Sequence, residues 1–192
     1  MRSFFDKRLV MLLIGCLIAL SGCAASPGSL RAMETTVYSD SHGYRLKVPV
    51  DWVFSQDTEQ PNIIAFNSSD SRISLQIVTE LGGYGFNSVA ELGAQVFDIL
   101  SEGFEGLVIE TNLSVRNMNK QYRQQFSFDG QDARMVIDNY IYAPYPSINL
   151  HLFFIVSAED YGSKQALFSD IIRSLEIYLS VDEIYMQIEQ NA

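Results

Sequence analysis

The stretch Gly43–Trp52, GYRLKVPVDW, decides the fold class of this sequence. Its apolar and polar residues alternate, which is the two-residue period of a strand with one buried face. The apolar positions are Tyr44, Leu46 and Val48, and the polar ones are Arg45 and Lys47. Pro49 ends the strand because proline has no N–H for a further ladder hydrogen bond. We expect Trp52 to fold back into the core, so the domain opens with a short, half-buried strand.

Further strands are predicted by the same alternation at 63–66, 73–78, 107–116 and 148–156. The first two flank the polar turn 67–71 and are typical of a hairpin. The last is apolar on both faces, which indicates a central strand of a sheet.

The Asp129-Gly130 dipeptide lies between two more alternating runs and predicts a two-residue hairpin turn. That turn would pair Phe126 with Ala133. The side chains expected together on the opposite, more polar face are Arg123, Gln125, Arg134 and Asp138.

Two helices are predicted by apolar residues at helical spacing, one over 88–103 and one over 163–178. Asn87 or Ser88 would cap the first helix and Asp160 the second. The chain is therefore expected to be an α+β protein, with an antiparallel sheet of about seven strands flanked by two main helices.

The N-terminus has the pattern of a signal peptide over 1–22. Arg2, Lys7 and Arg8 precede the apolar run 9–20. A helix of that run would reach only about 18 Å, against a hydrocarbon core of about 30 Å, so it is too short to span a bilayer.

The residues Leu20-Ser21-Gly22-Cys23 resemble the lipobox of bacterial lipoproteins, in which the cysteine becomes the lipidated first residue of the mature chain. The alternative is an ordinary secretory signal that ends beside a cysteine. Lipidation of Cys23, with palmitate among the acyl chains, makes the lipid bilayer the first expected partner. By resemblance to Gram-negative sorting signals, Ala24 favours the outer membrane and a periplasmic domain; a Gram-positive source would place it on the extracellular face.

The mature chain is divided into a flexible tether over 23–34, one domain over 35–179 and a polar tail over 180–192. Cys16 leaves with the signal and Cys23 is acylated, so the domain has no cysteine for a disulfide, a thiolate metal site or a nucleophile. The fold must therefore be stabilised by its core without disulfides.

The charge balance excludes nucleic acid as a partner. The chain has 13 basic and 23 acidic side chains and a net charge of −10. Residues 1–22 hold three of the basic and one of the acidic ones, so the mature chain has a net charge of −12. Such a surface repels phosphate backbones, although acidity also serves solubility.

No motif predicts catalysis or a cofactor. The glycine-rich run 81–86 joins a strand to a helix but matches no phosphate-binding fingerprint, and a plain loop is the simpler interpretation. The two histidines are His42 and His151. A metal site would need one of them beside Asp40, Asp138 or Asp160, which the spacing does not indicate. The sequence lacks a Gly-x-Ser-x-Gly nucleophile elbow, and we expect no enzyme activity.

The aromatic segment Tyr140–Pro146, YIYAPYP, is the candidate contact surface. Rigid rings beside prolines give contact area at a low entropy cost, which suits binding to a protein partner. The expected contact residues are Tyr140, Tyr142 and Tyr145. The alternative is that these tyrosines lean on their own domain.

Over 38–178 the sequence resembles the PsbP-like family. The shared features are Tyr38 and Asp40 before Gly43-Tyr44, Pro49 with Trp52, the run 88–93 (SVAELG) and the run 171–176 (IIRSLE). The resemblance implies the Mog1/PsbP-like α/β/α sandwich and a non-catalytic factor for assembly or stability of a membrane complex. It implies a photosystem II accessory role if the source is a phototroph. A small-ligand carrier or an enzyme of unknown chemistry stays an alternative, because fold alone does not carry activity.

Overall fold

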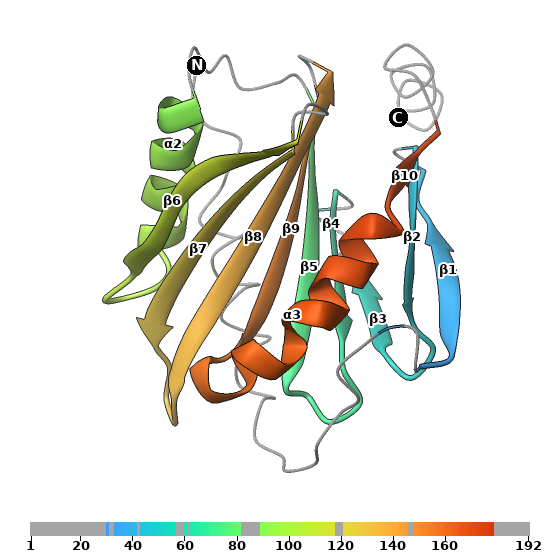
Figure 1. Cartoon of the computed structure of the whole chain (residues 1–192), viewed down its shortest axis with the longest axis horizontal. Coiled ribbons are helices and arrows are strands. Elements are labelled where there is room, and N and C mark those ends of the chain that lie inside the picture. The colour runs from blue at the N-terminus through green and yellow to red at the C-terminus, as the bar shows by residue number, and fades with distance from the viewer. Residues whose placement is uncertain are drawn as a thin grey trace.

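The computed structural model describes residues 30, 33–41, 43–56, 60, 62–81, 89–117, 121–145 and 148–178. In these residues a seven-stranded antiparallel sheet has the order β3-β4-β5-β9-β8-β7-β6, and a smaller sheet has the order β1-β2-β10 (Figure 1). The strands are β1 Thr35–Ser39, β2 Tyr44–Pro49, β3 Val53–Gln56, β4 Ile63–Asn67, β5 Ile73–Leu81, β6 Val108–Asn117, β7 Gln121–Asp129, β8 Arg134–Tyr145, β9 Ile148–Ser157 and β10 Glu176–Ile177. The helices are α2 Val89–Ser101 and α3 Ala158–Arg173. The predicted α+β class is confirmed.

The opening stretch forms β2 as predicted. Tyr44, Leu46 and Val48 are buried, whereas Arg45 and Lys47 are exposed. β2 pairs with β1 on one side and with the short β10 on the other. Trp52 is 8% exposed and belongs to the core, which confirms its predicted inward position.

The strand β9 is the middle strand of the large sheet, which confirms the inference from its apolar faces. One face of the sheet, here called the α3 face, packs Leu152 and Phe154 against Leu167 and Phe168 of α3 and against the small sheet. The other, the α2 face, packs against Leu92, Val96 and Leu100 of α2. The central strand therefore supplies both cores.

The predicted two-residue turn at Asp129-Gly130 is wrong. Phe126 pairs with Ile137, and Asp129 with Arg134, so four residues connect β7 and β8. A tight type I′ turn requires positive φ at both central residues. Among the described glycines only Gly43 and Gly106 have positive φ, and Gly130 instead donates its N–H to the Ala133 carbonyl at 2.9 Å. The shift leaves every side chain on its predicted face.

The helix α3 begins five residues before its predicted start. Ser157 is the N-cap, and its hydroxyl accepts the Asp160 N–H at 3.1 Å. The prediction that Asp160 caps the helix is therefore wrong, because Asp160 lies in the first turn, where its charge suits the helix dipole. The predicted helix end at residue 178 is also wrong: α3 ends at Arg173, and Glu176 and Ile177 pair with β2 as the strand β10. The predicted end of α2 near Gly103 agrees with Ser101, while Asn87 and Ser88 lie outside the described residues.

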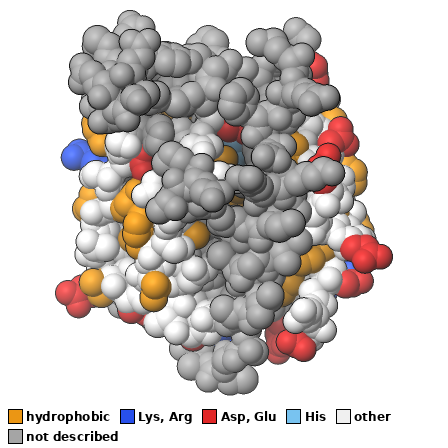
Figure 2. Space-filling view, turned by 180° about the vertical axis from the view of Figure 1, so that it is seen from behind, with side chains coloured by type: hydrophobic (Ala, Val, Ile, Leu, Met, Phe, Trp, Pro, Cys, Tyr) orange, Lys and Arg blue, Asp and Glu red, His pale blue; other side chains and the backbone are white. Residues whose placement is uncertain are grey.

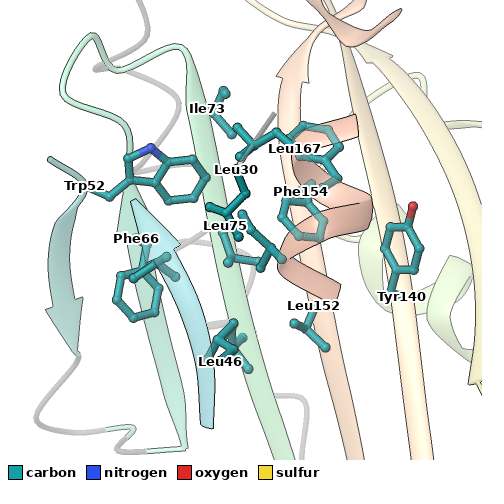
Figure 3. Packing of buried hydrophobic residues seen from close by; sticks show 14 of the residues in the cluster. Leu30, Leu46, Trp52, Phe66, Ile73, Leu75, Tyr140, Leu152, Phe154 and Leu167 are labelled. Carbon is teal, nitrogen blue, oxygen red and sulfur yellow. The ribbon is translucent and has the colours of Figure 1, made fainter. Parts of the chain in front are cut away.

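Core packing begins within the segment assigned to the tether. Leu30 is 7% exposed and belongs to the core on the α3 face, and Met33 packs against the same core. Figure 3 shows Leu30 beside Ile73, Leu75 and Leu167, with Phe154 between it and Tyr140. The core on the α3 face thus includes a residue upstream of Thr35. None of the described helices is long and apolar enough to cross a membrane.

Candidate functional site

A groove of about 220 Å³ lies between the C-terminal half of α3 and the strands β7 and β8. Its apolar lining comes from Tyr140, Ile141, Leu152, Ile172 and Leu175. Its polar lining includes Gln121, Tyr142, Ser169 and Arg173. The groove has a buried apolar floor and a half-exposed polar rim.

Strand and helix periodicity bring these residues together. Tyr140 and Tyr142 are two residues apart on β8 and therefore share the α3 face. Leu152 of β9 pairs directly with Tyr140. On α3, Ser169, Ile172 and Arg173 lie three and four residues apart and so face the same side. The site is non-local in sequence, with contributions from β7, β8, β9 and the end of α3.

An ion pair beneath α3 fixes the wall of the groove. Arg123 donates from Nε and Nη2 to the two oxygens of Asp138, both at 2.7 Å, and Asp138 is fully buried. Tyr161 of α3 donates its hydroxyl to Asp138 Oδ2 at 3.0 Å. The guanidinium carbon of Arg123 lies 5.2 Å from the centre of the Tyr140 ring. These contacts hold Tyr140 in place.

The surroundings of this ion pair favour the charged form of Arg123 and the neutral form of Tyr161. The hydrogen bond with Asp138 raises the pKa of Arg123. Burial raises the pKa of Tyr161, and the Asp138 carboxylate raises it further. The phenol is therefore a stable hydrogen-bond donor and no proton-transfer group at neutral pH.

The three tyrosines of the candidate contact surface have different positions. Tyr140 is 6% exposed and packs edge-on against Phe154, with 5.8 Å between ring centres, so it is a core residue and cannot serve as an exposed contact. Tyr142 is half-buried at the groove. The side chain of Tyr145 lies outside the described residues. The predicted surface is thereby reduced to Tyr142 at the groove, with Tyr140 as its wall.

The residues considered for a metal site are not brought together. His151 is 1% exposed on β9, with its Nε2 3.5 Å from Glu80 Oε2. Asp138 binds Arg123, Asp160 lies 3.6 Å from Arg72, and Asp40 accepts a hydrogen bond from Tyr38. Among the described residues no group of three His, Cys, Asp or Glu side chains could hold a metal ion. His42, Cys23 and residues 82–86 of the glycine-rich run lie outside the described part of the chain.

A buried polar row on the α2 face was missed by sequence reasoning. Gln76 of β5, Asn139 of β8 and Gln124 of β7 are each at most 2% exposed, and Phe153 of β9 pairs with both Gln76 and Asn139. Within the described residues, the side-chain amides of Gln76 and Asn139 have no hydrogen-bond partner. The sequence carried no distinct signal for this burial, because Gln76 follows Ser74 at the two-residue period and is typical of a polar strand face. The row is uncharged and holds no nucleophile.

The acidic character of the chain is visible on the surface. Figure 2 shows the rear of the molecule, where Asp and Glu side chains lie along the edges and Lys and Arg are scarce. Of the described residues that line the groove, Arg173 alone carries a formal charge. The groove is thus a local exception in an acidic protein.

Comparison with solved structures identifies the fold. The cyanobacterial PsbP protein CyanoP from Synechocystis sp. PCC 6803 matches with a TM-score of 0.61 and 12% identity, covering 80% of this chain and 98% of its own. The Ran-binding protein Mog1p of Saccharomyces cerevisiae matches with a TM-score of 0.57 and 9% identity, and the match covers 76% of this chain and 96% of Mog1p. The Glu-to-Ala mutant of the protein Mog1 matches with a TM-score of 0.60 and 8% identity, and the match covers 79% of this chain and 100% of the mutant.

These likenesses show the fold class. The chain has the Mog1/PsbP-like fold, as the resemblance to the PsbP-like family implied. No protein-family model and no curated protein sequence matches the chain. Because the identities are low, function has to be argued from the site.

Proposed function

We propose that this protein is a membrane-anchored, extracytoplasmic lipoprotein that binds a protein partner without catalysis, as an assembly or stability factor for a membrane complex. The groove beside Tyr142 is its contact site. The observation that carries the proposal is the size and chemistry of the groove. Its volume of about 220 Å³ is below the ~300 Å³ at which pockets for small organic ligands begin. It suits one side chain of a partner, held against aromatic walls.

The lining supports binding more than chemistry. General acid–base catalysis needs a titratable group poised near neutral pH, and nucleophilic catalysis needs an activated side chain beside a base. The described lining residues include no His, Cys, Asp, Glu or Lys. Tyrosine and arginine, which do line the groove, are the residues enriched at protein interfaces.

The anchor and the groove are compatible in geometry. The buried Leu30 follows Cys23 by seven positions, so a lipid on Cys23 would hold Leu30 within about 25 Å of the bilayer. Leu30 lies beside Ile73, which pairs with Val156 near the end of β9 (Figure 3). Tyr142 pairs with Leu150 near the start of β9, about 20 Å away along the strand. The anchored side of the domain and the groove would thus lie at different ends of β9, so that the anchor leaves the groove accessible.

The anchoring is tested with Cys23→Ser and, as a matched control, Cys16→Ser. We expect Cys23→Ser to abolish incorporation of an alkyne-labelled palmitate and to release the protein from membranes, whereas Cys16→Ser keeps both. Unchanged acyl labelling in Cys23→Ser would contradict the proposal.

The contact site is tested with Tyr142→Ala. The control is Phe54→Ala, which truncates a partly exposed aromatic residue at the opposite edge of the sheet. After crosslinking in intact cells, we expect Tyr142→Ala to lose the partner band and Phe54→Ala to keep it, with both variants folded by circular dichroism. Equal capture by the two variants would place the contact elsewhere.

A further inference from the structure

The groove carries a positive charge where the protein as a whole is negative. The Arg173 side chain is 74% exposed, and its Nη1 lies 3.0 Å from Asp170 Oδ1 one turn earlier. The Asp170 side chain is only 15% exposed, so the pair is open to water mainly at Arg173, and the contact uses Nη1 alone. The rest of the exposed guanidinium can donate two parallel hydrogen bonds to a carboxylate of a bound partner.

The groups around Arg173 complement a ligand of mixed character. Ser169 precedes it by one turn on the same side of α3, and Gln121 lies across the groove on β7. Both are neutral hydrogen-bonding side chains. Ile172 and Leu152 supply the apolar contact beside them. An apolar side chain would thus sit on the floor while a neighbouring anionic group meets Arg173.

We infer that the groove selects a partner peptide segment in which an aromatic or aliphatic side chain stands next to a carboxylate, and that Arg173 recognises the carboxylate. This inference rests on the proposed function. The net charge of −10 would favour cationic partners if the overall field decided the choice. The net charge alone would thus disfavour an anionic segment. A preference for such a segment would therefore be due to the groove and not to the overall charge.

The test uses the purified full-length protein in a neutral detergent and two probes of nearly equal shape. The first is N-acetyl-phenylalanine, which carries a carboxylate, and the second is N-acetyl-phenylalaninamide, which is neutral. Binding is followed by methyl NMR shifts of Ile172 and Leu175. We expect the acid to bind about threefold more tightly than the amide, and this ratio to fall towards one in high salt.

Two variants assign the effect to its residue. Arg173→Gln should abolish the difference between the probes, whereas Arg134→Gln should keep it, because that exposed arginine pairs with Asp129 and Glu110 away from the groove. Equal binding of the two probes, a tighter amide, or an unchanged ratio in Arg173→Gln would each overturn the inference. Absence of methyl shifts with both probes would overturn it too. If the Tyr142-dependent partner band persists in such a case, the proposed function stands while the inference fails.

Discussion

Arg123 and Asp138 form a two-pronged ion pair between β7 and β8, with both nitrogen–oxygen distances 2.7 Å and the carboxylate fully buried. The pair lies diagonally across the strands, since Arg123 is directly opposite Tyr140, and Asp138 opposite Gln125. Tyr161 completes it from α3. The contact therefore links the sheet, the helix and the wall of the groove.

Asp138→Asn is expected to destabilise the domain by about 3–5 kcal/mol, because it leaves the guanidinium of Arg123 without its countercharge in a partly buried position. Arg134→Gln, which breaks exposed ion pairs with Glu110 and Asp129 and a hydrogen bond to Ser127 Oγ, should cost less, about 1–2 kcal/mol. Urea unfolding of both variants measures the difference. Similar losses in the two would show that the buried pair is not a major stabilising contact.

The pH dependence of stability should include an alkaline loss due to Tyr161. Burial and the Asp138 carboxylate raise its pKa in the folded state. In the unfolded chain a tyrosine ionises near pH 10. The stabilisation is therefore complete below about pH 10 and decreases as the pH rises above it. The unfolding free energy of Tyr161→Phe should fall less between pH 9 and pH 11 than that of the parent, and equal slopes would refute this assignment.

The polar row predicts a substitution that stabilises the protein. Gln76 is fully buried, and its amide has no partner in the described part of the chain. Replacing it with Met keeps its length and removes the desolvated amide, which should raise the unfolding free energy by about 1–2 kcal/mol. The readout is the urea midpoint at constant slope. A loss of stability would instead indicate that an ordered water or a ligand binds this amide.

Leu30→Ala tests whether the domain begins before Thr35. Truncating a leucine in a packed core costs about 2–5 kcal/mol. Val37→Ala, at a position 55% exposed on β1, should stay within about 0.5 kcal/mol of the parent. Thermal unfolding of the two variants gives the comparison. If Leu30→Ala left the stability almost unchanged, Leu30 would belong to the tether and not to the core.

The periodic elements could be predicted from sequence, because alternation and helical spacing are local signals. This is why β2 and the central β9 were assigned correctly. The register between β7 and β8 could not be predicted, because an Asp-Gly dipeptide only favours a two-residue turn statistically. The observed pairing of Phe126 with Ile137 brings two buried side chains together in the core.

The start of α3 could not be predicted because Ser157 is both the last residue of β9 and the N-cap of the helix. The groove combines β7, β8, β9 and α3, and only its tyrosines carried a local signal. Arg173 had none, since a single arginine near a helix end is an ordinary surface residue.

Binding of a partner in the groove is tested most directly by photo-crosslinking from the groove in intact cells. A benzoyl-phenylalanine is placed at Ser169, which lines the groove, or at Gln165, one turn earlier on an exposed position of α3. If the groove binds the partner, we expect a discrete crosslinked protein from position 169, none from position 165, and loss of the product when Cys23→Ser is combined with the probe at 169. Equal products from both positions, or none from position 169 while the protein is folded and membrane-attached, would contradict a groove-mediated role in a membrane complex.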